Sequence, residues 1–373
     1  MLSTDQQYIL QLLRESLRDD KREELSYTDL NAVASTITRN GILLTVYRKL
    51  PTAFEAQLKG FYNMSLKQSI VQGHIGERVL HALSDAGLSC IALKGWELRK
   101  LYPVPTMRQM ADLDILVKPY NFAAIKAAME KLGFSSGPES RWKHDSFFKN
   151  DVHVEMHKRL TDDSDVIHAW ERGLWDRAKA ADENIYKMSP EDYYIFHFVH
   201  LHKDFMNGSL GLRRIVDTWL LGKQPVDMDI VESYLKSFGM WRFHERMVKL
   251  SNVTMGDEPM DEDSEVLLTH AFTHGIYGSG KSYKAGRIAA MGGSLTTGKL
   301  KSRLAAVFLP YKRMKAQFPA LEKWPILLPY YWSKRISRFL KGNKKKYRRM
   351  LNYSDISEEE YNEMKRFFEA GGV

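Results

Sequence analysis

The stretch from residue 112 to residue 117 reads Asp-Leu-Asp-Ile-Leu-Val, and its pattern is typical of a β-strand at the centre of the fold. Side chains alternate between the two faces of a β-strand, so Asp112 and Asp114 project from one face and Leu113 and Ile115 from the other. Two adjacent carboxylates repel each other unless a cation lies between them. Magnesium binds a few carboxylates together with phosphate oxygens, so the pair suits a metal-bound triphosphate. Taken alone, the pair would fit two solvated acids about equally well.

A second alternating segment supplies a third carboxylate. Residues 151–157 read Asp-Val-His-Val-Glu-Met-His, which places His153, Glu155 and His157 on the face opposite the apolar side chains. If the two strands are neighbours, Glu155 reaches the same site as the aspartates. A transition-metal site made by these two histidines and Glu155 is the alternative. Same-face side chains lie about 6.5–7 Å apart along a strand, which is a poor geometry for three ligands of one ion.

A turn upstream of the paired aspartates has the composition of a phosphate-binding loop. Residues 89–93 form an apolar run that reads as a buried strand and ends at Lys94-Gly95. Gly95 would let backbone amides approach a phosphate at the start of a helix, and Lys94 would balance the phosphate charge. A Lys-Gly pair is common, so its value lies in its position before the carboxylates.

The remaining elements predict an α+β fold, with a small mixed sheet flanked by extensive N- and C-terminal helices. Residues 145–149 and 151–158 are expected strands, and Pro119 is expected to open a helix that Gly133 closes. A hydrophobic content of 44% is ample for a packed core. We expect a helical region at 1–88, an α/β core at 89–160, a helical domain at 161–280 and a basic, aromatic-rich helical tail at 281–373.

The order of these motifs resembles a family of uncharacterised bacterial nucleotidyltransferases of the DNA polymerase beta type. The resemblance rests on 93–95, Tyr102-Pro103, Arg108, 112–117 and 153–157, and it extends through 200–203, 211–213 and Asp217. It implies a small sheet flanked by helices, two bound magnesium ions and a nucleoside triphosphate as substrate. It also implies that Asp112 and Asp114 are the paired metal ligands and that Glu155 is the third.

The activity implied is transfer of a nucleoside monophosphate group to a hydroxyl or phosphate acceptor. Glu155 is also a candidate general base. We further expect Arg108 or Arg213 to contact the triphosphate or a phosphorylated acceptor, because guanidinium groups bind phosphate in a bidentate manner. The alternative for Arg213 is an i,i+4 salt bridge with Asp217 on one helix. A catalytically weak nucleotide-binding or scaffold protein is the alternative function.

The net charge of +9 is concentrated near the C-terminus. From Lys281 to Arg349 there are 19 Lys or Arg residues and one acid, Glu322, so this segment carries +18 and the rest of the chain −9. Basic residues interleaved with Trp and Tyr suit an anionic membrane surface. The same composition suits RNA, or a solvated basic face packed on the acidic body. A membrane-facing enzyme of this type would fit surface-polysaccharide metabolism.

Other features set the expected compartment and one rival motif. The single cysteine, Cys90, excludes an internal disulfide, and residues 1–7 lack a secretory signal, so we expect a cytoplasmic protein, peripheral at the inner membrane face if its tail binds lipid. Residues 275–282 fit the P-loop pattern of a kinase or NTPase, with Lys281 and Ser282 at its end. The segment before it reads as a helix rather than a strand, which argues against a working P-loop.

Overall fold

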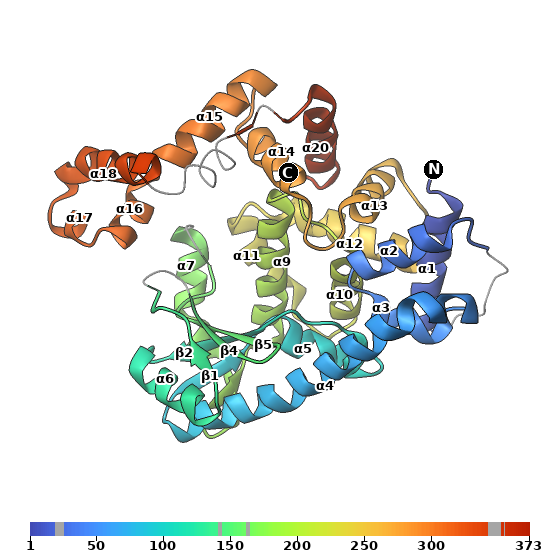
Figure 1. Cartoon of the computed structure of the whole chain (residues 1–373), viewed down its shortest axis with the longest axis horizontal. Helices are drawn as coiled ribbons and strands as arrows, with labels where there is room; N and C mark the ends of the chain where they lie inside the picture. Colours follow the sequence, from blue (N-terminus) through green and yellow to red (C-terminus); the bar gives the residue numbers. More distant parts are fainter. Residues whose placement is uncertain (19–25, 141–143, 162–164, 342–351, 354) are drawn as a thin grey trace. The chain divides into compact units, whose positions relative to one another are not determined.

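The computed structural model describes residues 1–18, 26–140, 144–161, 165–341, 352–353 and 355–373. The chain forms two compact units (Figure 1). The first contains Met1–Lys203, Leu210–Tyr277 and Ala370–Val373, and the second contains Asp204–Ser209 and Gly278–Glu369. The predicted sheet and its carboxylates therefore lie in the first unit, and most of the basic tail lies in the second.

Helices precede the sheet, as the sequence predicts. They are α1 (Thr4–Leu17), α2 (Leu30–Arg39), α3 (Leu43–Val46), the 3-10 helices η1 (Tyr47–Lys49) and η2 (Thr52–Phe54), and α4 (Glu55–Asp85). Pro51 precedes η2 and the long helix α4, which ends shortly before Gly87, where φ is +70°. Glycine is favoured there because a positive φ costs other residues conformational energy.

A seven-stranded mixed sheet forms the centre of the first unit, in the order β3-β4-β5-β2-β1-β7-β6. The strands are β1 (Ser89–Ala92), β2 (Leu113–Lys118), β3 (Ser135–Ser136), β4 (His144–Lys149), β5 (Val152–His157), β6 (Lys179–Asp182) and β7 (Ile185–Lys187). β2 runs antiparallel to β1 and parallel to β5. The structure confirms the predicted α+β fold with a small mixed sheet.

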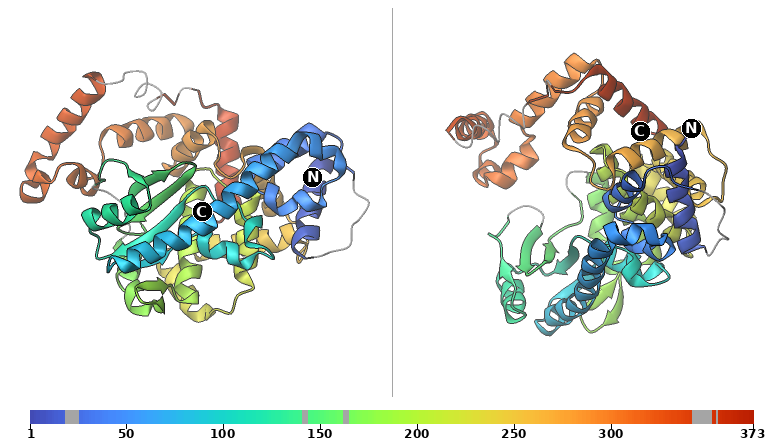
Figure 2. Two further views of the ribbon diagram at one scale, coloured as in Figure 1. Left: turned by 60° about the horizontal axis from the view of Figure 1, so that its bottom comes forward. Right: turned by 45° about the vertical axis from the view of Figure 1, so that its right-hand side comes forward.

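Two helices cover the apolar face of this sheet. α4 and α6 (Phe122–Lys131) pack against one core with the inward side chains of β2 and β5, including Leu113, Ile115 and Val154. Figure 1 shows α4 and α6 beside the sheet, and Figure 2 shows α4 in two further views. α6 begins after Asn121, whose side chain caps it, and not at Pro119 as predicted. The opposite face of β2 and β5 is thus left for polar side chains.

Short elements connect β1 to β2. They are α5 (Gly95–Leu98), η3 (Arg99–Leu101) and η4 (Pro105–Met107). After β5 come α7 (Asp165–Arg172), α8 (Leu174–Arg177), the β6–β7 hairpin, α9 (Pro190–Met206), α10 (Leu212–Gly222), α11 (Met228–Ser237), α12 (Trp241–Met255) and α13 (Glu262–His274). The β6–β7 hairpin is an element that the expected helical domain at 161–280 did not include. All four residues of β6 are exposed, so no apolar alternation marked that strand.

The second unit is helical in its described part. Its helices are α14 (Gly280–Ala290), α15 (Leu295–Val307), α16 (Tyr311–Gln317), α17 (Ala320–Lys323), η5 (Pro325–Leu327), α18 (Leu328–Lys341) and α20 (Glu358–Ala370). The basic run 344–349 lies outside the described residues. Among the described residues, no helix combines the length and the apolar character that a bilayer-crossing segment needs.

Candidate active site

Backbone pairing between β2 and β5 brings the predicted carboxylates together. Asp114 is directly opposite Glu155 in the parallel register, and Leu113 is opposite Val154. Asp112 stands just before β2, two residues from Asp114, and so shares its face. Donor atoms of Asp112, His153 and Glu155 all lie within 4.8 Å of one another. The two strands therefore present three carboxylates to one site.

Asp114 lies at the centre of the hydrogen-bond network in this site. Its Oδ1 accepts hydrogen bonds from Nζ of Lys94 and from Nε2 of His157, both at 2.7 Å. The Asp114 side chain is only 3% exposed, whereas that of Lys94 is 25% exposed. The partly exposed Lys94 side chain therefore extends from the solvent to the buried carboxylate of Asp114.

The pKa values describe a cluster of crowded acids and compensating cations. Burial and the charge of Asp114 raise the pKa of Asp112. Burial also opposes ionisation of Asp114, but hydrogen bonds from His157 and Lys94 outweigh it and hold the pKa of Asp114 well below its usual range. Burial opposes ionisation of Glu155 as well, but the hydrogen bond from His157 and the charges of His144 and His157 together lower its pKa. Asp112 is thus the carboxylate whose ionisation a further cation would favour most.

Histidines from two strands surround Glu155. Nε2 of His144 lies 3.3 Å from one Glu155 oxygen, and Nε2 of His157 lies 3.4 Å from the other. His144 on β4 is directly opposite His157 on β5. The pKa of His157 is raised, since its bonds to Asp114 and Glu155 outweigh burial. In the described residues, the structure divides the polar face into two overlapping groups, His144-Glu155-His157 and Asp112-His153-Glu155, instead of the predicted alternative of one ion between 153, 155 and 157.

These donors suit a divalent cation. Carboxylate oxygens are the ligands that magnesium prefers, and Asp112 retains electrostatic repulsion from Asp114 and Glu155. The site already favours the protonated forms of two protein groups, Lys94 and His157, whose pKa values are both raised. A site that stabilises positive charge in this way fits a divalent cation. In the described residues, the carboxylates whose oxygens lie within 4.8 Å of each other in one group are those of Asp112 and Glu155, while Asp114 contacts Lys94 and His157.

The backbone at Lys94 has an unusual conformation. Lys94 has φ +45° and ψ −118°, and its carbonyl accepts a 2.6 Å hydrogen bond from the Tyr193 hydroxyl on α9. The next residue, Gly95, has a packing role that the sequence did not indicate. A Cβ added at Gly95 would come within 2.4 Å of Nη1 of Arg108. The absence of a side chain at Gly95 thus leaves room for the buried guanidinium of Arg108.

The two predicted phosphate-binding arginines are engaged inside the protein. Nε and Nη2 of Arg108 donate to the two carboxylate oxygens of Asp217, each at 2.7 Å, and the Tyr102 hydroxyl donates to the same carboxylate at 2.9 Å. Nη1 of Arg213 donates to the carbonyl of Gln109 at 2.7 Å. The bidentate partner of Asp217 is therefore Arg108, and not Arg213 one helical turn away. Sequence reasoning missed this pair because its members are 109 positions apart.

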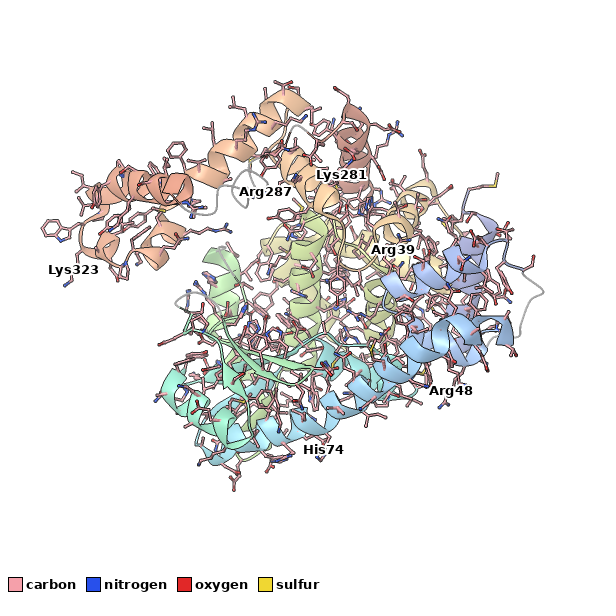
Figure 3. All side chains as sticks on the ribbon, in the orientation of Figure 1. Arg39, Arg48, His74, Lys281, Arg287 and Lys323 are labelled. Carbon is pink, nitrogen blue, oxygen red and sulfur yellow. The ribbon has the colours of Figure 1, made fainter. Side chains whose placement is uncertain are left out.

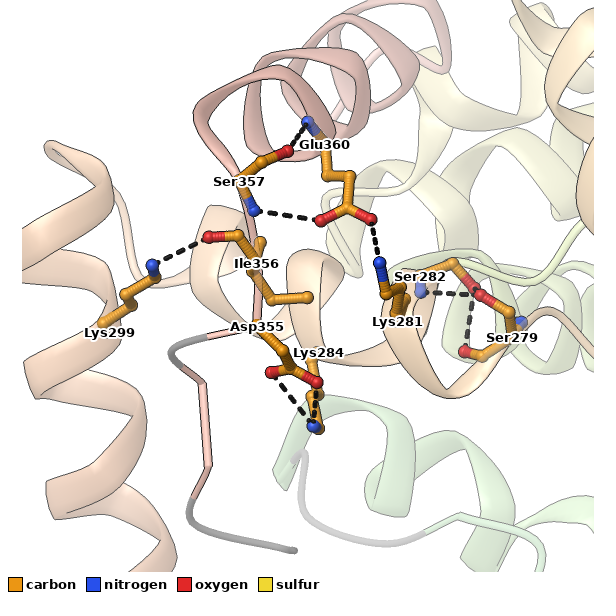
Figure 4. A network of polar contacts seen from close by, with 9 residues as sticks. All are labelled: Ser279, Lys281, Ser282, Lys284, Lys299, Asp355, Ile356, Ser357 and Glu360. Atoms are coloured by element: carbon orange, nitrogen blue, oxygen red, sulfur yellow. Dashed lines mark hydrogen bonds and ion pairs between the residues drawn. The ribbon is translucent and has the colours of Figure 1, made fainter.

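The P-loop-like segment has a different local structure from a nucleotide-binding loop. It follows helix α13, and Ser279 caps α14 in a reciprocal capping box with Ser282. The Ser282 hydroxyl donates to the Ser279 carbonyl at 2.9 Å, and Nζ of Lys281 pairs with Glu360 at 2.9 Å (Figure 4). A P-loop requires a preceding strand and amides directed at phosphate, so the capping box accounts for the motif.

Comparison with known proteins agrees with the geometry of the first unit. Residues 5–256 match the family described as uncharacterised nucleotidyltransferase. The chain belongs to this family. No curated protein matches this nucleotidyltransferase. A solution structure of the antibiotic-resistance factor ANT(2'')-Ia, reported to show substrate-regulated conformation dynamics, matches at 14% identity and a TM-score of 0.35. That match covers 46% of this chain and 92% of the other, and a likeness of this degree supports no further conclusion.

The family match confirms the predicted resemblance and the predicted class of enzyme. The matched residues include β1, the turn at Lys94-Gly95, β2 and β5, so the carboxylate site lies within the matched part. Membership in a nucleotidyltransferase family implies a nucleotide substrate and an acceptor.

Proposed function

We propose that this chain is a magnesium-dependent nucleotidyltransferase that moves a nucleoside monophosphate group from a nucleoside triphosphate to a hydroxyl or phosphate acceptor. The observation that carries the proposal is the direct pairing of Asp114 with Glu155, with Asp112 two residues away on the same face. Asp112, Asp114 and Glu155 would hold two magnesium ions. When bound, the ions neutralise triphosphate charge and lower the pKa of an attacking hydroxyl.

Lys94, Glu155 and His157 have further roles in this proposal. Lys94 is the partly exposed cation beside Asp114 and would bind the phosphates of the substrate. The pKa of Glu155 is lowered, so this carboxylate is ionised at neutral pH and is able to accept a proton from the acceptor. His157 holds Asp114 and Glu155 in place through Nε2. Direct phosphate contacts by Arg108 and Arg213, and a role in surface-polysaccharide metabolism, stay predictions.

Calorimetric titration with magnesium nucleoside triphosphates, followed by a pyrophosphate-release assay, tests the proposal. Asp112→Asn, Asp114→Asn and Glu155→Gln should each lower pyrophosphate release about 100-fold or more, because each removes a ligand that stabilises transition-state charge. Asp151→Asn is the matched control, since Asp151 precedes the same strand β5 but is exposed. It should retain the activity of the unmodified chain.

Two outcomes would point to other functions. Nucleotide binding without pyrophosphate release, across the common triphosphates and acceptors, would favour the scaffold alternative. Loss of nucleotide binding in Lys281→Ala, with binding retained in Asp112→Asn, would favour the P-loop alternative. Because Lys281 pairs with Glu360, we expect Lys281→Ala to keep both nucleotide binding and pyrophosphate release.

A further inference from the structure

A small helical corner of the second unit exposes several large apolar side chains. It is formed by the end of α17, the 3-10 helix η5 and the start of α18, and we call it the 324–330 corner. The exposed fractions are 63% for Trp324, 83% for Ile326, 37% for Leu327 and 56% for Tyr330. Soluble proteins expose single apolar side chains often, but four within seven residues are a recognised mark of an interaction surface.

These side chains are exposed although a core lies next to them. Met314, Phe318 and Leu321 are buried, and Tyr331 and Trp332 of α18 pack against them. The Phe318 and Tyr331 rings stack with centroids 4.6 Å apart, and Nε1 of Trp332 donates to the Leu309 carbonyl at 3.0 Å. The packing of 331 and 332 holds the start of α18 in place. The exposed residues of the 324–330 corner therefore directly precede residues that are fixed by packing against this core.

The surroundings of the corner are positively charged. Residues 281–341 contain 14 Lys or Arg residues and one acid, Glu322, which Nζ of Lys315 contacts at 2.9 Å. Lys323 directly precedes Trp324, is exposed, and points away from the ribbon in Figure 3. The acids of the second unit beyond residue 354 include Asp355 and Glu360, which pair with Lys284 and Lys281 of α14 (Figure 4). These two acids pair with lysines of α14, so they do not neutralise the positive charge of the residues around the corner.

A second apolar stripe runs along α15 in the same unit. Leu300 and Leu304 are 58% and 49% exposed, and Phe308 follows at the same four-residue spacing and is 43% exposed. Residues four apart lie on one face of a helix. Phe308 contacts the Trp332 ring edge-on at 5.3 Å, which connects the end of α15 to α18. Lys301 and Arg303 are exposed on the same helix.

We propose that the second unit binds the surface of an anionic lipid bilayer, with the 324–330 corner inserted at the level of the headgroups. Trp and Tyr prefer this level, while Ile326 and Leu327 would enter the acyl chains. Lysines and arginines of 299–335 would bind anionic headgroups. Binding at the interface needs a cationic surface with protruding apolar side chains, and the corner combines the two features.

The aliphatic side chains favour a bilayer over RNA as the partner. Single-stranded RNA is bound by stacking on aromatic rings and by cations at the phosphates. Ile326, the most exposed member of the corner, has no ring on which a base could stack. Burial of aliphatic surface in hydrocarbon is favourable, so a bilayer can interact with all four exposed side chains of the corner.

Co-sedimentation of the full chain with lipid vesicles tests the proposal. We expect binding to vesicles of phosphatidylcholine with about one third phosphatidylglycerol, and at least about tenfold weaker binding to phosphatidylcholine alone. The double variant Trp324→Ser, Ile326→Ser should weaken binding to the anionic vesicles about tenfold or more, because it removes most of the buried apolar area. Both side chains are largely exposed, so the variant should fold normally, which its thermal unfolding midpoint checks.

The matched control is Phe61→Ser, Met64→Ser, which makes the same kind of change on α4 of the first unit. Phe61 and Met64 are 53% and 63% exposed, and the control should bind vesicles as the unmodified chain does. Brominated lipid should quench tryptophan fluorescence in the unmodified chain and quench it less in Trp324→Phe.

Several outcomes would overturn the proposal. Equal binding to neutral and anionic vesicles would do so, and so would unchanged binding by the corner variant or an equal loss in the α4 control. Binding of single-stranded RNA that persists in the corner variant, without any binding to vesicles, would identify RNA as the partner instead. None of these measurements involves turnover, so failure of the nucleotidyltransferase proposal would leave this result unaffected.

Discussion

Lys94 combines a strained backbone with a charge in the site. Its φ of +45° lies in the region that favours glycine, and a non-glycine residue there costs about 1–3 kcal/mol. Nζ of the same residue contacts Asp114, and its carbonyl accepts a hydrogen bond from the Tyr193 hydroxyl. Strain at a site persists where the surroundings hold it, and these two contacts do so.

A pair of substitutions at Lys94 separates the backbone from the charge. Lys94→Ala and Lys94→Gly both lose the contact to Asp114, but only glycine is relaxed at this φ. We expect the free energy of unfolding of Lys94→Gly to exceed that of Lys94→Ala by about 1 kcal/mol, measured by urea denaturation. Both variants should lose triphosphate affinity equally. Equal stability, or a more stable alanine variant, would show that the positive φ is not maintained.

Local alternation predicted the acids of the site, whereas side-chain pairing across the fold remained hidden. Asp112, Asp114 and Glu155 could be assigned to one face because strand periodicity acts over two residues. His144 is brought opposite His157 only by the β4–β5 register. The Arg108–Asp217 pair depends on how α10 packs, which no local pattern encodes.

At the level of elements, α4 supports the sheet through a close contact that requires glycine. A Cβ added at Gly76 would lie 2.3 Å from the Trp96 ring, which is itself buried next to β1 and β2. Gly60 is in the same helix, and a Cβ added there would meet nothing within 4 Å. One helix therefore contains a glycine needed for packing and one that has no contact to protect.

Alanine at these two positions should have opposite effects. Gly76→Ala should lower the free energy of unfolding by about 1–3 kcal/mol, because overpacking forces Trp96 or α4 to shift. Gly60→Ala should raise it by about 0.5–1 kcal/mol, since alanine is the better helix former. Urea denaturation measures both. A neutral or stabilising Gly76→Ala would contradict the close contact with Trp96.

The elements that the sequence predicted are those with a regular apolar pattern. β1, β2, β4 and β5 begin and end within a residue or two of the predicted strands. The β6–β7 hairpin was missed, because the exposed Lys-Ala-Ala-Asp of β6 has no apolar face. Its position in the sheet comes from the parallel pairing of β7 with β1, where Cys90 is opposite Ile185 and Ile91 is opposite Tyr186. Such pairing between distant segments cannot be read from the composition of either one.

At the level of the molecule, buried neutral histidines should make the fold sensitive to acid. Burial lowers the pKa of His197, His202 and His244 to about 4. The imidazole of an unfolded chain titrates near pH 6.5, so between these values the unfolded state binds protons that the folded state does not. The free energy of unfolding therefore falls as pH is lowered from about 6.5 to about 4. The pKa of Asp217 is lowered in the folded state, so its contribution to the free energy of unfolding is lost only as pH falls below the pKa of an unfolded aspartate.

His244 allows this dependence to be measured at one position. It is 5% exposed, and its Nε2 lies 3.0 Å from the Tyr194 hydroxyl. Its pKa shift corresponds to about 3 kcal/mol of stability lost by pH 4. Glutamine keeps an acceptor for Tyr194 but takes up no proton, so His244→Gln should lose about 3 kcal/mol less than the unmodified chain between pH 6.5 and pH 4. Urea denaturation at several pH values measures the difference.

The comparison of the two curves isolates His244 from the other titrating groups. His157, whose pKa is raised, acts in the opposite sense: its contribution is present below its unfolded pKa and is lost as pH rises through the folded pKa. This contribution is the same in both proteins and cancels in the difference. If the two stability curves run parallel from pH 6.5 to pH 4, the folded state already accepts a proton at His244, and the side chain is more hydrated than its burial beside Phe198 and Trp241 implies.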